Sequence, residues 1–193
     1  MRKVAVFDFD GTLTTKDTLL EFIKYTHGKL AFLIGFAIHS PLLVLMKLHL
    51  YPNWKAKQKV FAHFYKGMEF DKFVSYGERF ADYVEGIRKE TTINMFNELS
   101  HEGADVYVIS ASIDEWVRPF CSRLGVTDVL GTKVEVRDGK LTGMFLTKNC
   151  YGQEKVNRLL EVEPSREEYY LYAFGDSRGD KEILEFADEG TKV

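Results

Sequence analysis

The stretch Val4-Ala-Val-Phe-Asp-Phe-Asp-Gly-Thr12 decides the fold of this chain. Residues 4–9 form a largely apolar run with β-branched residues, which is typical of a strand buried on both faces. Two further runs, at 104–109 and 169–174, have the same form, and each ends in small or acidic residues ahead of a helical pattern. Strand, polar turn and helix repeated in this way predict a doubly wound α/β fold around a parallel sheet.

Residues 15–85 separate the first strand from the second by far more chain than one crossover helix needs. This stretch is rich in lysine and aromatic residues and carries almost no strand signal. We therefore predict a helical cap domain over 15–85, inserted into a core domain formed by 1–14 and 86–193. Near the other end, 131–146 reads as an accessory β-hairpin with Asp138-Gly139 as its turn.

The composition excludes several classes of protein. A hydrophobic fraction of 45% and an aromatic fraction of 14% exclude a disordered chain. The 26 basic and 29 acidic residues give a net charge of −3, which argues against a nucleic-acid partner. The two cysteines lie far apart, so neither a disulfide framework nor a structural zinc site is expected. The start of the chain does not resemble a signal peptide, and we expect a cytoplasmic protein.

Acidic residues gather after two of the predicted strands, as Asp8 with Asp10 and as Asp176 with Asp180. The carboxyl ends of parallel strands meet at one edge of a sheet, where open α/β folds bind ligands. Adjacent carboxylates repel each other unless a cation lies between them. Neither cluster contains His or Cys, so the oxygen ligands favour Mg²⁺ over zinc. Taken alone, each cluster could equally be a surface turn or a helix N-cap.

Two weaker signals point to an anion. Ser110-Ala111-Ser112 follows the second predicted strand, where a hydroxyl and backbone N–H groups can bind an anion. Lys155 precedes a helical pattern, a place where a lone lysine is more often a solvated surface residue. By itself, neither signal is specific enough to assign a function.

Taken in order, these motifs resemble those of the haloacid dehalogenase-like phosphatases. They are Asp8-Phe-Asp-Gly-Thr12, the strand that ends in Ser110, the lysine at 155, and Gly175-Asp-Ser-x-x-Asp180. The resemblance covers nearly the whole chain and is nearest to the phosphoserine-phosphatase-like subfamily, which carries a helical cap after the first motif. Relatives of that group include phosphoserine phosphatases and bacterial phosphatidylglycerophosphate phosphatases.

The resemblance implies a role for each matching residue. Asp8 matches the nucleophile and Asp10 the general acid and base. Asp176 matches the residue that binds Mg²⁺ together with Asp8 and the backbone carbonyl of Asp10. Asp180 matches an acidic residue that supports these metal ligands. The residues that match those holding the phosphoryl group are Ser110, Ala111 and Lys155. Gly179 departs from the phosphoserine-phosphatase pattern, which usually has Asn before the last aspartate.

These roles imply a Mg²⁺-dependent phosphomonoesterase that forms a phosphoaspartyl intermediate. Phosphoserine phosphatase is the alternative, and a catalytically degenerate phosphate-binding module is a further one because of Gly179. A receiver-type signalling module also accepts phosphate on an aspartate, but it lacks the second aspartate and the inserted cap.

Residues 30–46 contain no charged side chain. As a helix they would extend about 25 Å, against about 30 Å for a bilayer core. His39-Ser40-Pro41 interrupts the middle of the segment and favours two short helices. A helix pair in the core of the cap is our first interpretation. A contact with a membrane surface is the second, since lysines follow that could meet anionic lipid, and a transmembrane helix is the last.

The substrate is the least determined feature. Phosphoserine phosphatases pair a cap arginine with the substrate carboxylate, and an acidic residue near the first motif meets its amine. Here Asp17 matches the acidic residue, but no arginine occurs between Arg2 and Arg79, and Lys59 is the nearest cap position. Lysine lacks the bidentate fork of arginine. We therefore predict a phosphorylated small molecule or lipid phosphate with an apolar leaving group, and leave the oligomeric state open.

Overall fold

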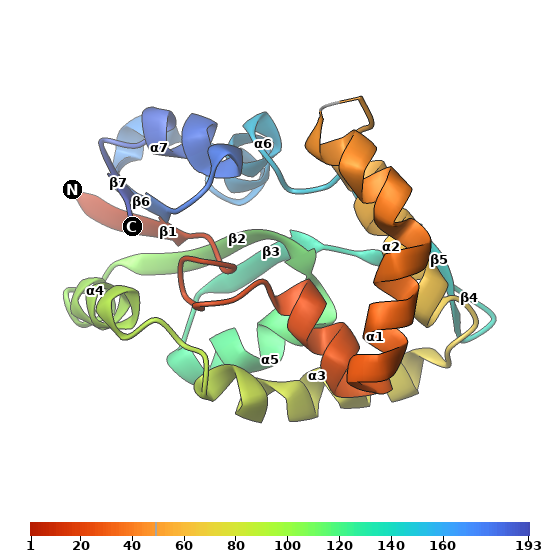
Figure 1. Cartoon of the computed structure of the whole chain (residues 1–193). Coiled ribbons are helices and arrows are strands. Elements are labelled where there is room, and N and C mark those ends of the chain that lie inside the picture. The colour runs from red at the N-terminus through yellow and green to blue at the C-terminus, as the bar shows by residue number, and fades with distance from the viewer. Residues whose placement is uncertain (49) are drawn as a thin grey trace.

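A five-stranded parallel sheet forms the centre of the computed structural model, which describes residues 1–48 and 50–193 (Figure 1). The strand order is β3-β2-β1-β6-β7, and every neighbouring pair is parallel. The strands are β1 (Arg2–Phe7), β2 (Asp105–Ile113), β3 (Asp128–Thr132), β6 (Tyr169–Gly175) and β7 (Glu189–Lys192). The predicted α/β class is confirmed.

Helices cover both faces of this sheet (Figure 1). One face carries α4 (Glu90–His101) and α5 (Asp114–Leu124), and the other carries α6 (Gln153–Val162) and α7 (Lys181–Phe186). Side chains alternate along β1, so Ala5 and Phe7 enter one hydrophobic core while Val4 and Val6 enter the other. Residues 4–7 of this strand are all apolar because both faces are buried there. Two short 3₁₀ helices, η1 (Arg166–Glu168) and η2 (Arg178–Asp180), flank β6.

The strand ends differ from the predicted ones in a way that matters for the site. β1 ends at Phe7, so Asp8 and Asp10 lie in the loop that follows it rather than on the strand. β2 continues to Ile113, past the predicted end at 109, so Ser110 and Ala111 lie within the strand. The reason for this extension is pairing, because Ile113 still pairs with β3 after an irregularity in the register.

Three helices fill the stretch predicted to be helical: α1 (Thr18–Lys47), α2 (Asn53–Tyr65) and α3 (Phe70–Glu85). Aromatic rings join them, since Phe22 packs edge-on against Phe73 and Phe80 and stacks on Trp116 of α5. The predicted hairpin is confirmed as β4 (Val134–Arg137) and β5 (Lys140–Phe145), and β5 packs against α2. The division into a cap over 15–85 and a core over the rest stays a prediction.

The path of α1 corrects our prediction of an interruption around Pro41. The helix continues through this proline. Proline leaves the carbonyl of Ala37 without its usual N–H partner, and the Ser40 hydroxyl donates to that oxygen instead at 2.8 Å. The break falls at Gly28, whose φ of 82° lies in a region that glycine enters readily. The chain therefore changes direction at Gly28 and returns along α2 after residue 50 (Figure 1).

The stability of the fold should depend on pH through Glu115, in the first turn of α5. Its Oε2 is buried without a partner among the described residues, and burial raises the pKa of the carboxyl to about 7. In the unfolded chain the Glu115 carboxyl has its ordinary pKa of 4.5. The free energy of unfolding of the wild type should therefore fall as the pH rises from about 4.5 to about 7. Glu115→Gln should remove this loss. Its free energy of unfolding relative to the wild type should therefore be about 1–2 kcal/mol higher at pH 8 than at pH 5.

Urea unfolding of Glu115→Gln and wild type at pH 5, 6, 7 and 8 measures this difference. Glu167→Gln, at an exposed position, is the matched control and should show no pH-dependent gain. A difference between Glu115→Gln and wild type that stays constant over this range would contradict the assignment.

Candidate active site

The carboxyl ends of β1, β2 and β6 open onto a cavity of about 320 Å³. Most of the residues that the sequence nominated line it, although they come from loops, strands and helices far apart in the chain. These residues are Asp8, Asp10, Asp17, Ser110, Ala111, Lys155, Asp176 and Asp180. The sheet topology therefore brings the predicted site together at one edge.

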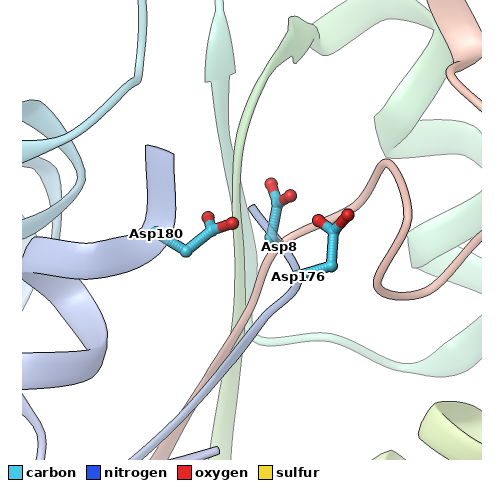
Figure 2. A group of neighbouring side chains, drawn as sticks. All are labelled: Asp8, Asp176 and Asp180. Carbon is cyan, nitrogen blue, oxygen red and sulfur yellow. The ribbon is translucent and has the colours of Figure 1, made fainter. Parts of the chain in front are cut away.

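Three carboxylates converge at the base of this cavity (Figure 2). Asp8 follows β1, Asp176 follows β6 and Asp180 ends η2, and each offers an oxygen within 4.8 Å of the others. Lys155, in the first turn of α6, donates to Asp8 Oδ1 at 2.6 Å and to Asp180 Oδ1 at 2.5 Å. The Ser177 N–H donates to Asp180 Oδ2 at 3.0 Å in a capping box, and the Ser177 hydroxyl donates to the same oxygen at 2.7 Å, so Asp180 is held firmly.

Burial sets the charge state of this group. Asp8 and Lys155 are 8% and 3% exposed. Desolvation raises the pKa of Asp8 to about 7, against the opposing effect of the Lys155 ammonium. Burial alone would lower the pKa of Lys155, but the carboxylates of Asp8 and Asp180 outweigh it and raise the pKa above its ordinary value. The lysine is therefore a permanent positive charge, and further positive charge nearby would ionise Asp8.

The donor set fits a hard divalent cation. Desolvation, with the charge of Asp180 adding to it, raises the pKa of Asp176, and its Oδ1 is buried without a partner among the described residues. Lys155 contacts Asp8 and Asp180 but not this oxygen. Three clustered carboxylates with one unsatisfied oxygen are the ligands that Mg²⁺ takes, and no nitrogen or sulfur ligand lies among them. Asp180 also offers an oxygen within 4.8 Å of those of Asp8 and Asp176, although the resemblance implies only a supporting role for it.

The carboxyl group of Asp10 is bound by the start of α1 and by the end of β2. Its Oδ1 accepts from the Thr18 N–H at 2.7 Å and from the Thr18 hydroxyl at 2.5 Å. Its Oδ2 accepts from the Ser112 hydroxyl of β2. Three donors therefore fix the carboxyl group at the wall of the cavity, beside Asp8 but outside the cluster of three.

The end of β2 supplies polar groups on the opposite wall. Ser110 is 1% exposed, and its hydroxyl accepts from the Ser112 N–H at 3.0 Å. The Ala111 carbonyl accepts from Lys57 Nζ at 2.7 Å. Ser110, Ala111 and Lys155 thus all line one cavity, and their binding of a phosphoryl group stays a prediction.

The cap lysine that reaches the site is Lys57 rather than Lys59. Lys57 lines the cavity with Asp17, whereas Lys59 is exposed and lies over the Tyr51 ring at 5.5 Å. Two residues along a helix turn a side chain by about 200°, so only one of the two lysines can face the site. Ala56 and Val60 are buried and define the inward face of α2. The apolar periodicity of residues 53–65 is therefore the sequence signal that could have identified Lys57.

Tyr151 was not predicted, and it accounts for Gly179. A Cβ built on Gly179 would lie 2.5 Å from the Tyr151 ring, so no side chain fits there while the ring is in place. The Gly152 N–H donates to the Gly179 carbonyl at 2.8 Å and holds the two segments together. Tyr151 lines the same cavity as Gly179 and fills the space where a side chain at position 179 would begin. The asparagine of the phosphoserine-phosphatase pattern would therefore clash with this ring.

Gly179→Asn should therefore destabilise the protein by itself and be tolerated together with Tyr151→Ala. Gly179→Asn forces the Tyr151 ring out of its place, and we expect a loss of about 1–3 kcal/mol of stability from overpacking. Gly179→Asn/Tyr151→Ala should recover most of that loss. Thermal unfolding of both variants and of Tyr151→Ala gives the coupling energy, and additive effects would contradict a direct contact.

Comparisons with known proteins agree with this geometry. A family model described as haloacid dehalogenase-like hydrolase matches residues 5–185. Protein CicA of Caulobacter vibrioides is 30% identical over 190 residues, covering 96% of this chain and 83% of CicA. A structure of unknown function from Bordetella pertussis matches with a TM-score of 0.80 and 18% identity, over 97% of this chain and 87% of that one. A phospho-aspartyl intermediate analogue of phosphoserine phosphatase matches with a TM-score of 0.66 and 22% identity, over 99% and 85%.

Proposed function

The chain belongs to the haloacid dehalogenase-like hydrolase family, and we propose that it is a Mg²⁺-dependent phosphomonoesterase that forms a phosphoaspartyl intermediate on Asp8. The observation that carries the proposal is the cluster of Asp8, Asp176 and Asp180, in which Lys155 binds Asp8 and Asp180, with Asp10 fixed beside it. Asp8 and Asp176 would hold the cation together with the backbone carbonyl of Asp10, and Asp180, bound to Lys155 and Ser177, would support them. When bound, Mg²⁺ would neutralise charge on the phosphoryl oxygens and favour the ionised form of Asp8.

In the first step, an Asp8 carboxylate oxygen attacks phosphorus and the bond from phosphorus to the leaving oxygen breaks. The leaving alkoxide takes a proton from Asp10, which the Thr18 and Ser112 donors hold at the cavity wall. Lys155 and the Ser110 hydroxyl face the transferring group and offset the charge on its oxygens. The product is an acyl phosphate on Asp8 and a free alcohol.

In the second step, a water molecule attacks phosphorus through its oxygen, and Asp10 accepts a proton from that water. The bond between phosphorus and the Asp8 oxygen breaks, which releases inorganic phosphate and regenerates the carboxylate. Each step leaves Asp10 in the protonation state that the other one needs, so a single residue serves both.

For the substrate, we propose a phosphomonoester with an apolar or lipid-like leaving group. A second cavity, of about 390 Å³, shares Asp17, Lys57 and Tyr151 with the catalytic one. Its remaining walls are mostly apolar and come from α1 and α2; they include Leu19, Leu20, Phe36, Leu43, Met46 and Val60. No arginine lies among the described residues of either wall, so a substrate carboxylate would lack a bidentate partner.

A cytoplasmic location is part of the proposal. Cys121 and Cys150 are both buried as free thiols, a state that a reducing compartment preserves. Substrates at the inner surface of a membrane would be within reach of such a protein.

Turnover of p-nitrophenyl phosphate with Mg²⁺ and with EDTA tests the activity. We expect turnover only with the metal, and release of trapped phosphate from denatured enzyme by hydroxylamine, which cleaves acyl phosphates. Metal-independent turnover would overturn the proposal. Phosphate binding without turnover would support the degenerate binding module.

A comparison of kcat/KM tests the substrate class, using L-phosphoserine, glycerol phosphate and phosphatidylglycerophosphate in mixed micelles. Each methylene buried by the leaving group contributes about 0.8 kcal/mol, so two are sufficient for about a tenfold preference. We expect the lipid phosphate to exceed L-phosphoserine by at least this factor. Preference for L-phosphoserine would instead make the protein a phosphoserine phosphatase.

A further inference from the structure

The outer face of α1 is apolar although it faces solvent. Its large exposed apolar side chains fall on one stripe of the helix after Gly28 and include Leu30, Leu33, Ile34, Ile38, Val44 and Leu45, and Leu48 follows at the C-cap. Leu33 and Ile38 are each 61% exposed. The other side of the helix is apolar too, since Phe36, Leu43 and Met46 line the second cavity. A surface helix normally turns polar residues outward, so this stripe lacks its partner, and our prediction of a core helix pair is wrong for this face.

The charge around this stripe has one sign. Between Glu21 and Glu69 the chain holds seven lysines and no acidic residue, although the whole chain carries a net charge of −3. Lys29, after the break at Gly28, Lys47, at the end of α1, and Lys55, at the start of α2, are exposed. Leu50, ahead of α2, and Trp54, in its first turn, are 72% and 44% exposed. Apolar residues with flanking lysines and a tryptophan match the boundary between lipid tails and anionic headgroups.

The path of the chain favours a helix that lies on a bilayer over one that crosses it. By length and composition α1 could span a membrane, and only 6% of its most apolar stretch is buried. However, α2 packs along this helix, with the His63 ring against the His39 ring, and it carries Lys55, Lys57 and Lys59. A helix that crossed the bilayer here would draw these charges into the hydrocarbon core, which is unfavourable. A second copy of the chain is also a poor occupant, because a twofold interface would bring two lysine-rich segments together.

We propose that the outer face of α1, with the turn that leads into α2, docks on the surface of an anionic lipid bilayer. Leu33, Ile34 and Ile38 would enter the boundary of the acyl chains, and the lysines would meet the headgroups. The inner face of the same helix lines the cavity that joins the catalytic one. Docking would therefore hold the catalytic cavity close to lipid phosphates; this consequence rests on the proposed function, whereas the docking itself does not.

Co-sedimentation with vesicles tests the docking without any turnover. We expect the wild type to bind phosphatidylglycerol vesicles at least tenfold more tightly than phosphatidylcholine vesicles, and high salt to weaken that binding. Leu33→Lys/Ile38→Lys should lose at least tenfold in affinity for both. Lys29→Glu/Lys55→Glu should lose the preference for phosphatidylglycerol. Met144→Lys/Val162→Lys alters two exposed apolar residues elsewhere and should bind as the wild type does.

Circular dichroism and p-nitrophenyl phosphate turnover show whether each variant is folded. Wild-type protein that fails to bind phosphatidylglycerol vesicles, or a Leu33→Lys/Ile38→Lys variant that binds them as the wild type does, would overturn the docking. Sedimentation velocity adds a further test. If the wild type is a dimer and Leu33→Lys/Ile38→Lys is a monomer, the occupant of this face is a second copy and the proposal is wrong. Vesicle binding by a protein that hydrolyses no phosphate would overturn the proposed function and leave the docking in place.

Discussion

Asp8→Asn should lower the Mg²⁺-dependent turnover of p-nitrophenyl phosphate by a factor of about 10⁴ or more, as loss of a covalent nucleophile does. Asp8 is the member of the cluster of three that follows β1. It accepts a hydrogen bond from Lys155 and lines the cavity. An amide nitrogen or oxygen at this position cannot replace the carboxylate in attack on phosphorus. Asp8→Ala should behave in the same way and also lose the partner of the lysine.

The folded state should survive these changes, because Lys155 keeps its contact with Asp180. Asp138→Asn is the matched control, since it makes the same chemical change at the hairpin turn, where φ is 48° and Asn is well tolerated. Phosphate trapped on the wild type and absent from Asp8→Asn completes the measurement. Turnover in Asp8→Asn within tenfold of the wild type would exclude the covalent mechanism.

The sequence predicted the fold and most of the site for one physical reason. Chemistry-bearing residues at the ends of parallel strands gather wherever the strands pair, so the order of β2, β1 and β6 was enough to bring Asp8, Ser110 and Asp176 into one cavity. The family assignment from the ordered motifs is confirmed by the match over residues 5–185.

The errors at Pro41 and at Lys59 concern local signals that the sequence does contain. The Ser40 hydroxyl that bonds the Ala37 carbonyl lies in the same helix, and the general rule about proline leaves such a contact out. The apolar periodicity of α2 distinguishes Lys57 from Lys59. The length of β2 is different, because it depends on pairing with β3 beyond an irregular register, and there a tertiary contact overrides the local signal.

Asp10→Asn should separate the two steps of the reaction. Asparagine can keep the native contacts, because its oxygen can still accept from Thr18 and the Ser112 hydroxyl can turn to accept from its amide. It cannot transfer a proton. p-Nitrophenolate leaves readily without one, so we expect the first step to persist and the second to slow by about 10²–10⁴. The result should be a burst of product equal to the enzyme concentration, with the acyl phosphate accumulating on Asp8.

Metal affinity distinguishes this role from that of Asp176. The carboxylate of Asp10 lies outside the cluster of three, so the Mg²⁺ concentration for half-maximal turnover should change by less than about threefold in Asp10→Asn. Asp176→Asn removes the negative charge of the group whose Oδ1 is unsatisfied and should raise that concentration by about tenfold or more. With an alkyl phosphate, whose leaving group needs the proton, Asp10→Asn should also lose its burst. A steady-state rate without a burst on p-nitrophenyl phosphate, or a loss of Mg²⁺ affinity equal to that of Asp176→Asn, would show that the two aspartates have been assigned each other's roles.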